Sequence, residues 1–94
     1  MIKHYQIRVT GLVQGVFYRA ATKAVADQLG VKGLVYNRDD GSVYVEAEGD
    51  TFALEIFLDY LQHGPEKAEV EHVEWNEAEL KNYRNFEVVK KIKN

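Results

Sequence analysis

Apolar and polar residues alternate along three stretches of the chain. Apolar side chains occupy every second position at residues 5–9 and 43–47, and Val73 and Trp75 alternate with polar neighbours at 72–76. A period of two is typical of strands with one buried face. The apolar runs at 33–37 and from Phe86 to Val88 predict two further strands. The pattern therefore predicts five strands, the last of them short.

Two of the intervals between these strands have apolar residues at the spacing of an amphipathic helix. Residues 20–29 are rich in helix-forming residues and are followed by Gly30, a typical C-cap. Asp50 or Thr51 can cap a second helix, which Gly64-Pro65 ends. The apolar stripes expected to face the core are Tyr18, Ala21, Val25 and Leu29 in the first helix and Leu54, Phe57, Leu58 and Leu61 in the second.

The predicted order is β-α-β-β-α-β with a short terminal strand, and Asp39-Asp40-Gly41 marks a hairpin between the second and third strands. This is the α+β, ferredoxin-like split β-α-β sandwich, in which two helices cover one face of an antiparallel sheet. We expect residues 1–94 to form a single domain. The first and second strands then run parallel with the third between them. Arg19, after the loop that follows the first strand, and Asn37, at the end of the second strand, consequently fall at the same edge of the molecule.

Composition and charge narrow the classes of function. The formal net charge of -3 argues against a nucleic-acid-binding protein. Lys32-Gly33-Leu34-Val35-Tyr36 begins like an RNA-binding motif but lacks its aromatic positions. No cysteine is present, which excludes disulfides and thiolate chemistry. Without a signal-like or membrane-length apolar run, we expect a cytoplasmic protein that binds no membrane, and nothing in the pattern demands more than a monomer.

The stretch GLVQGVFYR at residues 11–19 sets two glycines four apart before the first predicted helix. Unpaired N–H groups at a helix start form an anion site, and glycines let the preceding loop curl around it. Arg19, unfavourable beside the positive end of the helix dipole, would then grip the anion with its planar fork. The alternative is a tight turn followed by a solvated surface arginine. The spacing matches neither a Walker loop nor GxGxxG.

Asn37 closes the second predicted strand and also has two interpretations. An asparagine before a turn commonly bonds its own backbone in an Asx-turn. Alternatively, its amide holds a water molecule near an anion bound by the loop.

The remaining polar residues predict no further chemistry. His4, His63 and His72 lack metal-ligand spacing and are expected on the surface, and no metal site is predicted. The acidic residues Glu66, Glu69, Glu71 and Glu74 indicate a solvated strand face. Lys90, Lys91 and Lys93 are typical of charges that protect an edge strand.

With these elements placed, the chain resembles the acylphosphatases. Their G-x-V-Q-G-V-x-F-R signature stands here as Gly11-Leu12-Val13-Gln14-Gly15-Val16-Phe17-Tyr18-Arg19. Their G-x-V-x-N-x-x-D-G-x-V block stands as Gly33-Leu34-Val35-Tyr36-Asn37-Arg38-Asp39-Asp40-Gly41-Ser42-Val43. Gly64-Pro65-Glu66-Lys67-Ala68-Glu69-Val70 and Phe86 match later positions. Tyr18 is the one departure within the signature, where phenylalanine is usual.

The resemblance implies a hydrolase that cleaves the carboxyl–phosphate bond of small-molecule acyl phosphates without metal or cofactor. It implies that Arg19 binds the phosphate and Asn37 positions water. Gln14, Gly15, Val16, Phe17 and Tyr18 would join Arg19 in the phosphate-binding loop. A non-catalytic phosphate- or anion-binding module on the same fold is the alternative, because this fold hosts many functions.

Overall fold

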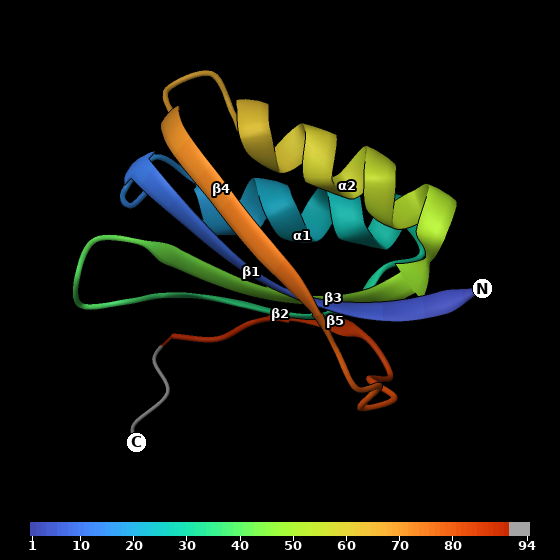
Figure 1. Ribbon diagram of the computed structural model, residues 1–94. Helices are drawn as coiled ribbons and strands as arrows, with labels where there is room; N and C mark the ends of the chain where they lie inside the picture. Colours follow the sequence, from blue (N-terminus) through green and yellow to red (C-terminus); the bar gives the residue numbers. More distant parts are fainter. Residues whose placement is uncertain (91–94) are drawn as a thin grey trace.

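One five-stranded sheet, in the order β4-β1-β3-β2-β5, organises the chain. The computed structural model describes residues 1–90 (Figure 1). The strands are β1 (Ile2–Leu12), β2 (Lys32–Asn37), β3 (Val43–Asp50), β4 (Glu69–Ala78) and β5 (Phe86–Val88). The helices α1 (Tyr18–Leu29) and α2 (Thr51–His63) both cover one face of the sheet, as Figure 1 shows. The predicted element order and the ferredoxin-like arrangement are confirmed.

The predicted antiparallel pairing is confirmed for the four longer strands, whereas the short terminal strand β5 pairs with β2 in parallel. The other three pairings, β1 with β3, β1 with β4 and β2 with β3, are antiparallel. Residues 79–85 carry the chain from β4 at one edge to β5 at the other, on the side away from the helices (Figure 1). The chain returns in the direction opposite to β4, which is also the direction of β2. The sheet is therefore mixed.

The core lies between the sheet and the helices. From α2, Leu54, Phe57 and Leu61 are fully buried, as predicted, and Leu58 packs partly buried against them. The strands contribute alternate apolar residues, among them Ile7, Val9, Val43 and Val45. Burial of such side chains is the main favourable term in folding.

The buried stripe of α1 differs from the predicted one beyond Tyr18. Thr22 and Ala26 are fully buried, whereas Ala21, Val25 and Leu29 are half-buried. Positions 18, 22 and 26 form one row along a helix. The small side chains of Thr22 and Ala26 let the helix approach the sheet, and the larger residues then flank the contact.

Turns and caps agree with the sequence. Asp50 accepts a hydrogen bond from the Phe52 N–H at 3.0 Å and begins α2, and Gly30 ends α1 in the left-handed conformation. The register of β1 against β4 shifts between Thr10 and Gly11. A Cβ on Gly11 would lie 2.2 Å from the Glu69 carbonyl oxygen, so the glycine permits this close approach of backbones.

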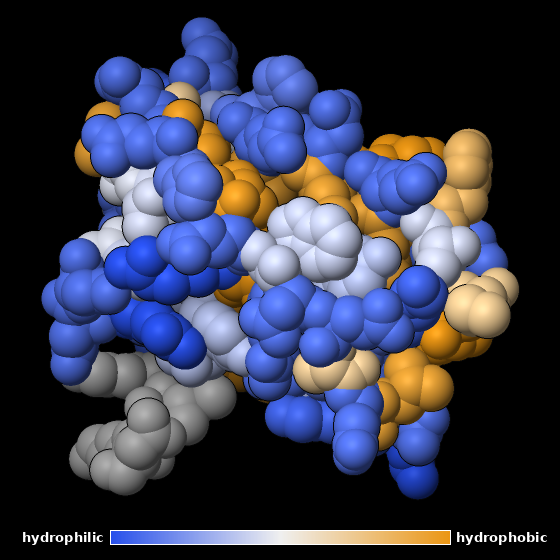
Figure 2. Space-filling view, in the orientation of Figure 1, coloured by the Kyte–Doolittle hydropathy of each residue, from blue (hydrophilic) through white to orange (hydrophobic). Residues whose placement is uncertain are grey.

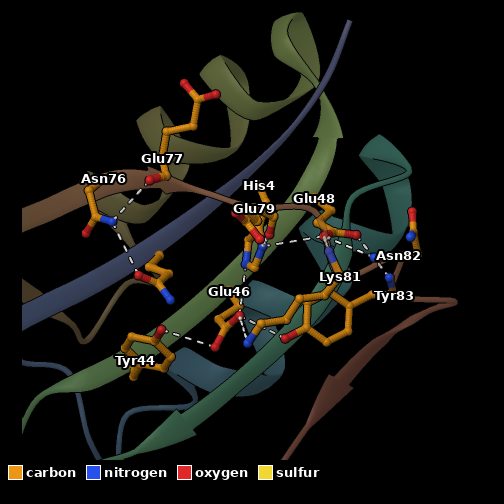
Figure 3. A network of polar contacts seen from close by, with 11 residues as sticks. His4, Tyr44, Glu46, Glu48, Asn76, Glu77, Glu79, Lys81, Asn82 and Tyr83 are labelled. Carbon is orange, nitrogen blue, oxygen red and sulfur yellow. Dashed lines mark hydrogen bonds and ion pairs between the residues drawn. The ribbon is translucent and has the colours of Figure 1, made fainter.

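The prediction that His4 is a surface residue is wrong, because its side chain is fully buried on the sheet face opposite the helices. Its Nε2 lies 2.8 Å from Glu46 Oε1 and its Nδ1 lies 2.6 Å from the Glu79 carbonyl oxygen (Figure 3). Glu48 accepts hydrogen bonds from the backbone N–H groups of Lys81, Asn82 and Tyr83. The 79–85 segment thus covers residues that strand periodicity places toward solvent.

The other histidines and the acidic residues of positions 66–74 lie on the surface. His63, His72 and the four acidic residues Glu66, Glu69, Glu71 and Glu74 are exposed, as predicted. Lys90 is exposed, while Lys91 and Lys93 lie outside the described residues. Figure 2 shows hydrophilic side chains over most of the face seen in Figure 1.

Candidate functional site

The loop between β1 and α1 supplies an unusual helix start. Phe17 occupies the N-cap position with φ 63°, in the left-handed region, and its side chain makes no capping hydrogen bond. The first N–H groups of a helix have no intrahelical partners. No side chain among residues 1–90 caps α1, so these N–H groups remain available for an external acceptor, and the helix dipole favours an anion there.

A pocket of about 300 Å³ lies beside this helix start. Its described lining consists of Val13, Gly15, Phe17, Tyr18, Arg19, Ala20, Asn37 and Val88. Arg19 and Asn37 are 18 positions apart in sequence, and the parallel arrangement of β1 and β2 brings both to this pocket, as the predicted topology requires. Arg19 is the one charged side chain among these eight residues.

Arg19 is half-buried, and its Nη1 donates a hydrogen bond to the Val89 carbonyl oxygen at 3.4 Å. This distance is at the long end for a hydrogen bond. A guanidinium has five N–H donors in a planar fork, so one long bond leaves donors for an anion in the pocket. Arg19 is therefore not the freely solvated arginine of the alternative interpretation.

Asn37 presents a buried acceptor that lacks a partner. Its Oδ1 is inaccessible to solvent and accepts no hydrogen bond from the described residues. This excludes the Asx-turn, in which that oxygen would accept a backbone N–H. A buried polar atom without a partner costs about 1–3 kcal/mol, and such atoms in native proteins call for a functional explanation.

The Asx geometry belongs instead to Asp40, in the β2–β3 hairpin. Asp40 Oδ1 accepts hydrogen bonds from the Ser42 N–H at 2.9 Å and the Ser42 hydroxyl at 2.5 Å. Arg8 pairs with the other carboxylate oxygen at 3.0 Å. Hydrogen bonds from Ser42, followed by that from Arg8, hold the pKa of the Asp40 carboxyl well below its usual range. Asp40 is therefore ionised at neutral pH, and its carboxylate holds the turn after Asn37 through these hydrogen bonds.

Gln14 joins the two halves of the site. Its side-chain Nε2 donates to the carbonyl oxygens of Arg38, at 2.7 Å, and Ser42, at 2.8 Å. One amide thus holds the loop before α1 against the hairpin that follows Asn37. Sequence patterns predict no role for this side chain, and only the spatial meeting of the two loops identifies one. Participation of the Gln14 backbone in phosphate binding stays a prediction.

The other loop residues differ in their exposure. Val16 packs partly buried against the core, whereas Gly15 and Phe17 are exposed and line the pocket. Tyr18 is 1% exposed, and its hydroxyl donates to the Leu61 carbonyl oxygen at 2.6 Å. Burial, together with the neighbouring Tyr60, raises the pKa of Tyr18 above its usual range. The hydroxyl that distinguishes Tyr18 from phenylalanine is therefore used to join α1 to α2.

Across residues 1–90, no three histidine, aspartate or glutamate side chains are grouped so that they could hold a metal ion. No helix in the same range is long and apolar enough to span a membrane.

Comparisons with known proteins agree with one another. The Acylphosphatase family model matches residues 5–88. An acylphosphatase of Thermotoga maritima is 47% identical over 87 residues, covering 93% of this chain and 97% of that protein. An acylphosphatase of Archaeoglobus fulgidus is 47% identical over 83 residues, covering 88% of this chain and 93% of the relative. The crystal structure of the Bacillus subtilis acylphosphatase superimposes with a TM-score of 0.91 at 36% identity, covering 95% of this chain and 99% of that one.

Proposed function

Starting from the acylphosphatase family, to which this chain belongs, we propose that the pocket hydrolyses acyl phosphates to a carboxylate and inorganic phosphate. Arg19 and the backbone N–H groups of residues 14–19 hold the phosphoryl group, and Asn37 holds the attacking water. The observation that carries this proposal is that Arg19 and Asn37 line one pocket beside the uncapped start of α1.

Phosphoryl transfer passes through a loose transition state whose charge is spread over the phosphoryl oxygens, so positioning and charge stabilisation account for most of the catalysis. The Arg19 fork can contact two of these oxygens at once. The uncapped start of α1 supplies N–H donors for the others. Because these donors belong to a helix and its N-cap residue, they are oriented before the substrate arrives.

Asn37, which lines the pocket with Arg19, completes the arrangement by hydrogen-bonding the attacking water through its side-chain amide. The water oxygen attacks phosphorus in line with the departing acyl oxygen, and the bond between phosphorus and that oxygen breaks. The proton of the water passes to a phosphoryl oxygen, because an amide cannot act as a base at neutral pH.

The leaving group requires no acid catalyst. A carboxylic acid has a pKa of roughly 4, so the departing carboxylate is stable as an anion at neutral pH. The titratable side chains of the described pocket lining are Arg19 and Tyr18, and the Tyr18 hydroxyl is bonded to Leu61. We therefore propose a metal-independent reaction without cofactor.

The second candidate is a module that binds phosphate without hydrolysing it, which needs the loop and Arg19 but has no use for Asn37. The test is the hydrolysis of benzoyl phosphate by the wild type, Arg19→Ala, Arg19→Lys and Asn37→Ala, with and without EDTA. We expect chelator-insensitive turnover in the wild type. Loss of a preorganised donor typically costs about 10²–10³ in rate, so Arg19→Ala should lose at least this much.

Arg19→Lys should recover only part of the loss, because an ammonium group lacks the planar fork. Phosphate binding without hydrolysis in the wild type would favour the binding module, and inhibition by EDTA would contradict the metal-independent reaction. Full turnover by Arg19→Lys would contradict bidentate binding. A monomeric state and a cytoplasmic location stay predictions.

A further inference from the structure

Phe17 is a large aromatic residue that the fold leaves outside its core. It is 79% exposed, yet it lines the pocket that contains Arg19 and Asn37. The side chain makes no capping hydrogen bond to α1. Neither core packing nor helix capping therefore explains a phenylalanine here.

The backbone conformation of Phe17 is one in which a phenylalanine is unexpected. Its φ of 63° lies in the left-handed region, where glycine is the favoured residue and a bulky side chain is an outlier. Gly15, two positions earlier, adopts φ 75° without a side chain. A glycine at 17 would relieve the backbone strain, so the phenylalanine here runs against a local conformational preference.

The remaining exposed lining of the pocket is also apolar. Val88, from the distant strand β5, is 42% exposed and lines the pocket together with the exposed Ala20. The polar lining side chains, Arg19 and Asn37, are only half-exposed. The pocket thus has one cation for a phosphoryl group, and its exposed part offers apolar surface from the start of α1 and from β5.

On the basis of the proposed function, we propose that Phe17 and Val88 form an acyl-binding wall, and that the preferred substrates are acyl phosphates whose acyl group is aromatic or an extended hydrocarbon. When the phosphoryl group is held at the start of α1, the acyl group lies outside it and contacts the exposed lining. An apolar acyl group buries surface against the ring and the valine. A carboxylate-bearing acyl group finds no second cation in the described lining.

The test compares kcat/KM for benzoyl phosphate and acetyl phosphate, which share the phosphoryl group and differ in the acyl group. In Phe17→Ala the ratio of benzoyl to acetyl activity should fall about tenfold, the scale of one lost apolar contact in a specificity pocket. Phe17→Gly should give a similar fall, although it relieves the backbone. Val88→Ala should lower the ratio by a smaller factor. The matched control is Phe52→Ala, which removes an exposed phenylalanine of α2 outside the pocket and should leave the ratio unchanged.

Inhibition by inorganic phosphate separates the possible results. The inhibition constant of inorganic phosphate should stay near the wild-type value in Phe17→Ala, because phosphate does not reach the acyl-binding wall. An equal loss for both substrates would show that Phe17 acts only through the loop backbone, and would overturn the acyl wall while leaving the proposed function intact. A wild type that hydrolyses neither substrate would overturn the proposed function and, with it, this inference.

Discussion

At the scale of single residues, the site combines one accessible cation with one buried acceptor that lacks a partner. Arg19 and Asn37 line the same pocket, and each breaks a local rule: an arginine at a helix start and an unsatisfied buried oxygen. Sites of function are where such local costs are expected.

Asn37 should therefore contribute to activity without contributing to stability. Asn37→Ala is expected to lower kcat by about 100-fold or more, because water is no longer oriented. The free energy of unfolding should not decrease, because no hydrogen bond to Oδ1 is lost and the cost of burying that oxygen without a partner is removed. Urea denaturation and steady-state kinetics on the same preparation measure both quantities. A clearly destabilised variant would show that Asn37 has a structural partner.

Tyr18 should show the opposite behaviour. Tyr18→Phe removes the buried hydrogen bond to the Leu61 carbonyl oxygen and restores the residue usual in the family signature. A buried hydrogen bond of this kind contributes about 0.5–1.5 kcal/mol, so the urea midpoint should fall while kcat/KM stays at its wild-type value. A change in kcat/KM without a change in stability would place the hydroxyl in the reaction instead.

At the scale of elements, the site depends on two loops that the sheet places next to each other. Residues 13–17 lead into α1, and residues 38–42 connect β2 to β3. Asp40-Gly41 predicts the hairpin, Gly30 predicts the end of α1, and Asp50 predicts the start of α2. These features are predictable because turns and caps depend on nearby residues. The contact between the loops depends on side chains distant in sequence, and local patterns did not identify it.

Gln14 is expected to control the alignment of these two loops. Gln14→Glu replaces two N–H donors with acceptors facing the carbonyl oxygens of Arg38 and Ser42. Displacement of about 1 Å in a catalytic arrangement can lower the rate up to about 100-fold. We expect kcat to fall and the inhibition constant of inorganic phosphate to rise, since the added carboxylate lies in the loop that is proposed to hold the phosphoryl group.

A double-mutant cycle with Asn37→Ala distinguishes this role from general destabilisation. If Gln14 acts by placing Asn37, Gln14→Glu should have little further effect on kcat in the Asn37→Ala background. Gln62→Glu, at an exposed position of α2, serves as the control for the change of charge. Additive losses would contradict the positioning role.

At the scale of the whole molecule, a polar cluster attaches the 79–85 segment to the open face of the sheet. His4 of β1 contacts Glu46 of β3, which also accepts hydrogen bonds from the hydroxyls of Tyr44, at 3.1 Å, and Tyr83, at 2.8 Å. Lys81 lies 3.1 Å from the same carboxylate. These groups, which Figure 3 shows around Glu46, connect the sheet to the segment that leads into β5.

This cluster should make stability depend on acid pH. Burial alone would raise the pKa of Glu46, but hydrogen bonds from Tyr83 and Lys81 outweigh it, and the pKa lies below its ordinary value of 4.5. A lowered pKa in the folded state stabilises the protein above about pH 4.5, and this contribution is lost as the pH falls through the folded-state value. The free energy of unfolding should decrease more steeply with acidification in the wild type than in Glu46→Gln.

Urea denaturation from neutral pH into the acid range measures this difference. Glu55→Gln, an exposed substitution on α2, is the control and should follow the wild-type dependence. If the free energy of unfolding had the same pH dependence in the wild type and in Glu46→Gln, a contribution from this carboxylate would be contradicted.

The amino-acid sequence is sufficient to predict the element order, the turns, the core face of α2 and the family, because period, caps and signature spacing are local properties of the chain. It also placed Arg19 and Asn37 at one edge, since the direction of each strand follows from element order. The parallel pairing of β5, the burial of His4 and Glu46, and the contact of Gln14 with the second loop become visible only in the folded chain. The physical reason is the same in each case: the path of residues 79–85 and the meeting of two loops bring together groups far apart in sequence, and burial and hydrogen bonding depend on those neighbours.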